Sequence, residues 1–89
     1  MTDLPPTFHA RRHKILVVCK TTPLGQVQPV SFTWRGKDYS ISSWGRRWQA
    51  GDGEHYLVMT DAGRMFELVH RTSDGEWFLL TAAPRHATV

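Results

Sequence analysis

The stretch from Val30 to Trp48 constrains the fold of this chain more than any other. It reads VSFTWRGKDYSISSWGRRW and contains three of the four tryptophans. Gly36-Lys37 in its middle suits a two-residue type II′ turn, because a glycine in first position adopts positive φ without a Cβ clash. This turn predicts a hairpin in which Trp34 lies opposite Tyr39 and Phe32 opposite Ile41.

The side chains of this hairpin separate into two faces, since successive residues of a strand point to opposite sides. A slip of one residue would mix the two sets, so the pattern itself favours the pairing. The first face is apolar and the second carries small hydroxyls: Val30, Phe32, Trp34, Tyr39 and Ile41 against Ser31, Thr33, Ser40 and Ser42.

Short β-rich segments alternate with turn signals along the rest of the chain. Asp61-Ala62-Gly63 predicts a hairpin in which Phe66 faces either Val58 or Met59, and the sequence leaves both registers open. A glycine inside a strand commonly marks a bulge, so we expect a bend at Gly45. Strands are predicted at 15–19, at 30–48 as the hairpin and its continuation, and at 54–60, 64–71 and 76–82; loops are predicted at 21–29, 51–53 and 73–75.

These segments predict an all-β fold, a small antiparallel meander of five to six strands. The last two strands carry apolar residues on both faces, which a flat sheet with one covered side cannot bury. Either the sheet curls into a roll or partly open barrel, with Ile15–Cys19 covering one side, or its second face meets another copy. The curled sheet is the favoured alternative, and a homodimer is the second.

The length of 89 residues predicts a single domain. We expect a flexible basic arm at 1–14, the β domain at 15–83 and a loose tail at 84–89. The longest apolar run, Ile15–Cys19, is far shorter than the ~20 residues needed to cross a membrane. The N-terminus lacks the pattern of a secretory signal, and a single cysteine cannot form an internal disulfide, so the expected location is cytoplasmic.

Charge is distributed unevenly along the chain. Residues 1–50 carry eight Lys/Arg against Asp3 and Asp38, whereas residues 51–89 carry three arginines against six acids. Arginine is most closely mixed with aromatic residues in the Trp44–Trp48 segment, where it could contact phosphate or a protein partner. Trp44 and Trp48 share a strand parity, so both could instead be core residues covered by arginine stems. The candidate binding residues are Arg35, Lys37, Trp44, Arg46, Arg47 and Trp48.

No constellation typical of catalysis stands out in the sequence. His9 and His13 lack a nearby acid or cysteine, and His55 and His70 lack a metal-site spacing. Cys19 sits in an apolar run, where a thiol is usually inert. We therefore expect a protein that is not an enzyme, with no catalytic residue, no metal, no cofactor and no small-molecule substrate.

Several short motifs resemble a small domain family appended to the C-terminus of ImuB-like proteins, which are inactive relatives of Y-family translesion DNA polymerases. The similarity spans about Gln28 to Leu80, and the family also occurs as short free-standing chains. The resemblance implies an accessory role in DNA damage tolerance and supplies no catalytic residues. This chain departs from the family in lacking a polymerase portion and in its own segment Met1–Val27. The motifs are Gln28-Pro29-Val30, Phe32-Thr33-Trp34-Arg35-Gly36, Tyr39, Trp44, Trp48, Tyr56, Asp61-Ala62-Gly63, Phe66-Glu67-Leu68, and Trp77 followed by Leu79 or Leu80.

The sequence therefore predicts a non-enzymatic β domain that binds a protein or self-associates, as an accessory to DNA repair. The alternative is a nucleic-acid-binding module that uses Arg35, Lys37, Arg46, Arg47 and the basic residues of segment 11–14. We expect no membrane partner.

Overall fold

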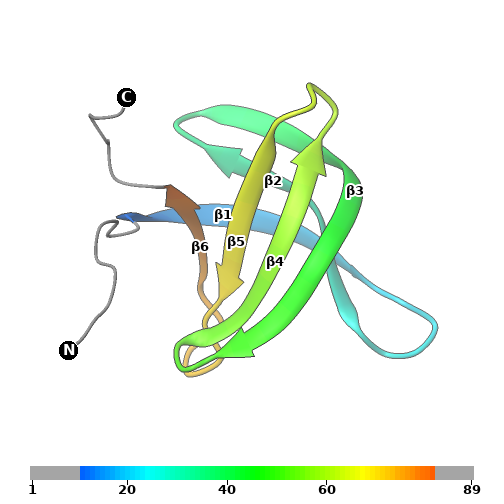
Figure 1. The fold of residues 1–89 in the computed structure, drawn as a ribbon, viewed down its shortest axis with the longest axis vertical. Coiled ribbons are helices and arrows are strands. Elements are labelled where there is room, and N and C mark those ends of the chain that lie inside the picture. Colours follow the sequence, from blue (N-terminus) through cyan, green and yellow to red (C-terminus); the bar gives the residue numbers. More distant parts are fainter. Residues whose placement is uncertain (1–10, 82–89) are drawn as a thin grey trace.

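Six antiparallel strands form a small closed barrel (Figure 1). The computed structural model describes residues 11–81, so the predicted tail at 84–89 and the first ten residues of the predicted arm lie outside the described part. The prediction of an all-β, curled antiparallel meander is confirmed. The strands are β1 (Arg11–Thr21), β2 (Val27–Trp34), β3 (Lys37–Ala50), β4 (Gly53–Thr60), β5 (Met65–His70) and β6 (Trp77–Thr81).

Two long, bent strands close the barrel. The first half of β1, Arg11–Ile15, pairs with β6, and its second half, from Leu16, pairs with β2. Strand β3 divides in the same way, because Lys37–Ser40 pairs with β2 whereas the remainder, from Ile41, pairs with β4. Each long strand therefore belongs to two walls of the barrel, and six strands suffice to enclose a core.

Two predicted boundaries near the N-terminus are wrong. Residues 11–14 belong to β1 and not to a flexible arm, because they pair with β6 and because Lys14 forms an ion pair with Glu76. Strand β2 begins at Val27, so the loop before it is shorter than the predicted 21–29. Hydrogen bonds between Thr22 and Gln26 close this loop, and Gly25 lies at φ +84°.

The first hairpin keeps its predicted faces but turns one residue earlier than predicted. Trp34 pairs with Lys37 and Phe32 with Tyr39, so the two turn residues are Arg35 and Gly36. Both have positive φ, 56° and 74°, as a type I′ turn requires. The predicted Gly36-Lys37 type II′ turn is wrong, although a shift of two in the pairing keeps Phe32, Trp34, Tyr39 and Ile41 on the inward face. Val30 departs from the predicted set, because it is half-buried while the neighbouring Pro29 is fully buried.

The core fills the barrel with side chains from every strand. Phe32 stacks on Tyr39 with ring centroids 4.9 Å apart, and Phe66 meets both rings edge-on. Val58 pairs with Phe66, which selects one of the two registers left open for the second hairpin. The buried core residues are Ile15, Phe32, Ile41, Tyr56, Val58, Phe66, Leu68, Trp77 and Leu79.

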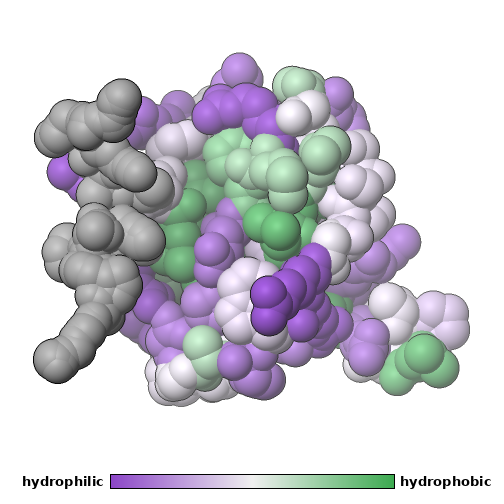
Figure 2. Space-filling model, viewed as in Figure 1, coloured by the Kyte–Doolittle hydropathy of each residue, from purple (hydrophilic) through white to green (hydrophobic). Residues whose placement is uncertain are grey.

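Exposed apolar side chains lie on β1, on β5 and in the β1–β2 hairpin, and those on β1 are Leu16 and Val18. Met65 on β5 is 54% exposed. Figure 2 shows hydrophobic side chains in the middle of the visible face. The β1–β2 hairpin projects from the barrel, and hydrophobic colouring appears at its end as well (Figures 1 and 2). Leu24 in that hairpin is 87% exposed.

Candidate binding site

The wall of the barrel has a discontinuity between β2 and β3. The ladder that joins them runs from Trp34–Lys37 to Ser31–Ser40, and within residues 11–81 it extends no further. Beyond Ser40, β3 turns toward β4. Within the described residues, β2 before Ser31 and β3 after Ser40 each have no partner strand on the side where the two strands face each other. We call the space between segment 27–30 of β2 and segment 42–50 of β3 the seam.

A tryptophan side chain bridges the seam. The indole Nε1 of Trp44 donates a hydrogen bond of 2.7 Å to the carbonyl oxygen of Pro29. Proline has no N–H, so it is found on sheet edges and at bulges. Pro29 is at such a position, because the β1–β2 register shifts between Val18 and Cys19, next to the Cys19–Pro29 pair. The bridge satisfies a buried carbonyl that β3 does not reach.

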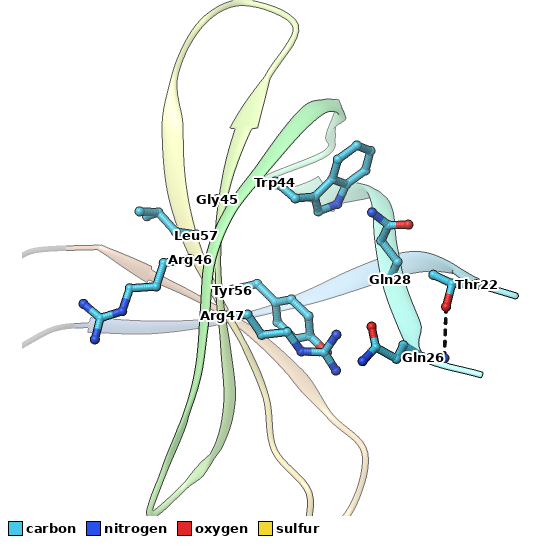
Figure 3. A pocket seen from close by; sticks show the side chains of 9 residues that line it. All are labelled: Thr22, Gln26, Gln28, Trp44, Gly45, Arg46, Arg47, Tyr56 and Leu57. Atoms are coloured by element: carbon cyan, nitrogen blue, oxygen red, sulfur yellow. Dashed lines mark hydrogen bonds between the residues drawn. The ribbon is translucent and has the colours of Figure 1, made fainter. Parts of the chain in front are cut away.

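A crevice of about 120 Å³ lies in the seam (Figure 3). Trp44, Arg47 and Tyr56 point toward the β1–β2 hairpin, where the amides of Gln26 and Gln28 face them. Arg46 and Leu57 point to the opposite side of β3 and β4. The nine lining residues are Thr22, Gln26, Gln28, Trp44, Gly45, Arg46, Arg47, Tyr56 and Leu57.

Arg47 is held on the crevice wall by two neighbours. Its Nε donates a hydrogen bond of 2.7 Å to Glu54, and its guanidinium lies 4.9 Å from the centre of the Tyr56 ring. The hydrogen bond from Arg47 is the main reason that the pKa of Glu54 is lowered. Burial, together with the charge of Glu54, raises the pKa of Tyr56 to about 12. At neutral pH the crevice therefore presents a neutral phenol, an ion pair and two amides, which suits binding through hydrogen bonds.

Cys19 adds a thiol near this crevice. Its side chain reaches solvent, while partial burial raises the pKa of the thiol and keeps it protonated at neutral pH. It lies close enough to Tyr56 for its charge to contribute to the raised pKa of that phenol. Since the chain has one cysteine, this thiol provides a unique chemical handle beside the seam.

The six predicted binding residues lie in three separate places. Arg35 lies in the turn of the first hairpin and Lys37 directly follows it, Trp44 and Arg47 line the seam, and Arg46 and Trp48 lie on the outer face of the sheet. The bend predicted at Gly45 is confirmed, because the β3–β4 register shifts between Trp44 and Arg47.

That bulge overturns the prediction that Trp44 and Trp48 share a face. Trp44 is turned toward the seam, 39% exposed, and neither tryptophan belongs to the buried core. Sequence reasoning also missed Gln26, Gln28 and Tyr56 as neighbours of Trp44 and Arg47. Pro29, as an edge residue, was the only signal that this side of β2 is open.

Basic side chains cover most of the aromatic rings. Trp48 is enclosed between the guanidinium of Arg46, 5.2 Å from one ring face, and the imidazole of His55, stacked at 5.2 Å. The other cation–ring contacts are Arg12 and Arg71 with Phe78, Arg35 with Trp34, Lys37 with Tyr39, Arg47 with Tyr56, and Arg64 with Phe66. Of the two tryptophans that the sequence predicts under arginine side chains, only Trp48 has this contact, and basic groups lie over rings of every strand except β1.

A second polar cluster lies on the outer face, around His55. Its Nδ1 is 2.6 Å from Glu67 and its Nε2 is 2.8 Å from Asp52, which also binds Arg12. His55 is only 7% exposed. This cluster ties the β3–β4 turn to β5 and β1, and it lies apart from the crevice lining.

Two arrangements of residues are absent from segment 11–81. It contains no group of three or more His, Cys, Asp or Glu side chains arranged to hold a metal ion. No helix there is long and apolar enough to span a membrane.

The fold and the seam together define a class, a small closed antiparallel β-barrel with a discontinuous wall. No protein-family model matches the chain, and neither a curated protein nor a solved structure matches it. The resemblance to the domain appended to ImuB-like proteins therefore stays a prediction.

Proposed function

We propose that this chain is a non-enzymatic interaction module that binds a protein partner at the seam. The observation that carries the proposal is the open main-chain edge of β3 beside a crevice lined by Trp44, Arg47 and two glutamines. Unpaired N–H and C=O groups on a sheet edge are a template for another chain. The titratable lining residues are two arginines, of which Arg47 is engaged by Glu54, and a tyrosine with a raised pKa, which supports binding over catalysis.

Nucleic-acid binding is the alternative, and charge is the feature that favours it. Residues 11–50 carry eight Lys/Arg and one acid, Asp38. Single-stranded nucleic acid also needs aromatic faces on which bases stack. In this protein a lysine or arginine side chain already lies over each of the rings of Trp34, Tyr39 and Trp48. A nucleobase would have to displace that side chain before it could stack. This weighs in favour of a protein partner.

A photo-crosslinker attached to Cys19 tests the proposal without disturbing the crevice walls. We expect the crosslinker to capture a partner protein, which mass spectrometry then identifies. The matched control moves the handle to the β4–β5 turn in the double variant Cys19→Ser/Ala62→Cys, which should not capture the same protein.

Affinity measurements with the purified partner decide the question. The double variant Trp44→Ala/Arg47→Ala should bind at least about tenfold more weakly by calorimetry, a loss of about 1.4 kcal/mol. Arg71→Ala, which removes a surface pair with Asp74, is the control and should bind as the wild type does. Equal affinity of the double variant would refute the seam as the binding site.

Oligonucleotides separate the two proposals. Fluorescence anisotropy with single-stranded and duplex DNA at low salt should show no saturable binding. Tight binding that weakens steeply with salt would instead favour the nucleic-acid module, since each phosphate contact contributes to the salt dependence.

A further inference from the structure

We infer that the seam receives an extended acidic peptide segment, which adds as a strand to the open edge of β3. This inference rests on the proposed function and specifies the chemistry of the partner. It follows from three features of the described residues: the free main-chain groups, the distribution of charge and the exposed apolar side chains of the β1–β2 hairpin.

The main-chain groups follow from the β3–β4 hairpin. Its two-residue turn, Gly51-Asp52, closes on the pair Ala50–Gly53. Hydrogen-bonded and non-hydrogen-bonded pairs alternate from such a closing pair, so Gln49 and Arg47 occupy non-hydrogen-bonded positions opposite β4. The N–H and C=O groups of both residues therefore point away from β4, toward the open edge, at the spacing that an added strand requires.

The facing edge of β2 does not compete for this partner. Pro29 has no N–H to donate, and its carbonyl oxygen already accepts the hydrogen bond from Trp44. The groups left for an incoming chain are thus concentrated on β3.

Charge identifies the partner as acidic. Lys20 pairs in register with Gln28 of the crevice, and Arg46 lies on β3 next to the open edge. Neither forms an ion pair within residues 11–81. Carboxylates on the side of the incoming strand that faces the crevice would meet Lys20 and Arg47, whereas lysines there would meet repulsion. Arg46 points to the opposite side of β3 and takes no part in these contacts.

Apolar side chains of the β1–β2 hairpin indicate what alternates with those carboxylates. Val27 is 37% exposed and Leu24 is 87% exposed on the projecting hairpin (Figure 1). Successive side chains of an added strand point to opposite faces, so one set can meet cations while the other meets this apolar surface. An alternating acidic and apolar sequence fits both sides.

A second copy of this chain fits the edge poorly. Antiparallel self-pairing centred on segment 42–50 would place Arg46 opposite its own equivalent, and like charges directly opposite are destabilising. The two register shifts in β3 also leave only Arg47–Ala50 as a regular run. Bulges and charges of this kind protect natural sheet edges against edge-to-edge association.

The first test uses a synthetic peptide of alternating Glu and Val, about eight residues long as in an ordinary strand. Titration followed by NMR should show saturable binding that weakens with salt, with new hydrogen-exchange protection at the amides of Arg47 and Gln49. A Lys-Val peptide of the same length is the control and should bind at least about tenfold more weakly. Equal binding of the two peptides, or binding without that protection, would overturn the inference.

The second test removes one main-chain donor. Gln49→Pro deletes an N–H that faces away from β4, so the β3–β4 ladder should survive, and binding of the Glu-Val peptide should fall at least about tenfold. Gln49→Ala keeps the N–H and should bind normally. If the proline variant does not fold, a Glu-Val peptide with N-methylated valines measures the same hydrogen bonds on the wild-type protein, and unchanged affinity would contradict strand addition.

These outcomes are distinguishable from failure of the proposed function. A crosslinked partner that needs Trp44 and Arg47 while the Glu-Val peptide does not bind would leave the interaction module standing and refute the acidic strand. A dimer by light scattering that Gln49→Pro dissociates would replace the peptide with a second copy and likewise refute it.

Discussion

His55 shows how a single side chain can fix the pH range in which the barrel is most stable. Burial lowers its pKa, but hydrogen bonds and charge from Asp52 and Glu67 outweigh burial, and the pKa is raised above 6.5. The hydrogen bond with His55 is the main cause that lowers the pKa of Asp52 from 3.8 to about 2. The other charged groups nearby are Arg12, which binds Asp52, and Arg46, which lies over the Trp48 ring that stacks on His55.

The sign of each contribution follows from proton binding in the folded and unfolded states. A raised histidine pKa stabilises the fold fully below pH 6.5 and loses this effect as the pH rises through the folded pKa. A lowered aspartate pKa stabilises the fold above pH 3.8 and loses this effect as the pH falls toward about 2. The cluster therefore stabilises most between these limits.

We predict that the free energy of unfolding, measured by urea denaturation, decreases from about pH 6 to about pH 9 and that His55→Gln reduces this decrease. His70→Gln removes a histidine that stacks on Trp77 and is the matched control, so it should retain most of the decrease. An identical pH profile for His55→Gln and the wild type would show that the cluster does not couple proton binding to folding.

At the scale of the elements, the first hairpin depends on two residues with positive φ. Gly36 lies at φ +74°, and no atom lies within 4 Å of the position that a Cβ would occupy. A methyl group added there would cause backbone strain but no steric clash. Gly36→Ala should cost about 1–2 kcal/mol of unfolding free energy. Gly51→Ala is the control, since Gly51 has neither positive φ nor a nearby atom, and it should be close to neutral. Thermal or urea unfolding of both variants measures the difference.

The same hairpin shows what the sequence could and could not predict. Alternation of side chains identified Phe32 and Ile41 as core residues, because a shift of two in the pairing does not change which face a residue occupies. The sequence predicts the turn one residue late, because Arg35 adopts a left-handed conformation that residues other than glycine rarely adopt. Local propensity favoured glycine in first position, whereas the barrel requires the twist of a type I′ turn.

At the scale of the whole molecule, the barrel is held closed by a core to which every strand contributes a buried side chain. Leu68 is fully buried, so Leu68→Ala should cost about 2–5 kcal/mol of unfolding free energy through lost transfer energy and a cavity. Leu24→Ala removes the same atoms at an exposed position and should change stability by less than about 0.5 kcal/mol. A small effect of Leu68→Ala in urea denaturation would contradict the closed barrel.

The sequence predicts barrel closure as one of two ways to bury both faces of the sheet, whereas it does not predict the seam. Apolar residues on both faces of the last two strands required curling, and the structure agrees. The seam depends on where β3 leaves β2, and bulges decide this in a way that no local residue pattern specifies. The same bulge separated Trp44 from Trp48 and dispersed the predicted binding residues over three surfaces.

For the acidic partner proposed above, the rings that carry basic groups have a consequence for the rate of association. Arg46 over Trp48 and Arg47 over Tyr56 are confined before any partner arrives, so less side-chain freedom is lost on encounter. Positioned charges of one sign steer an oppositely charged molecule and raise association rate constants by about 10- to 1,000-fold. For an acidic partner held mainly by main-chain hydrogen bonds, added salt should slow arrival much more than it speeds departure.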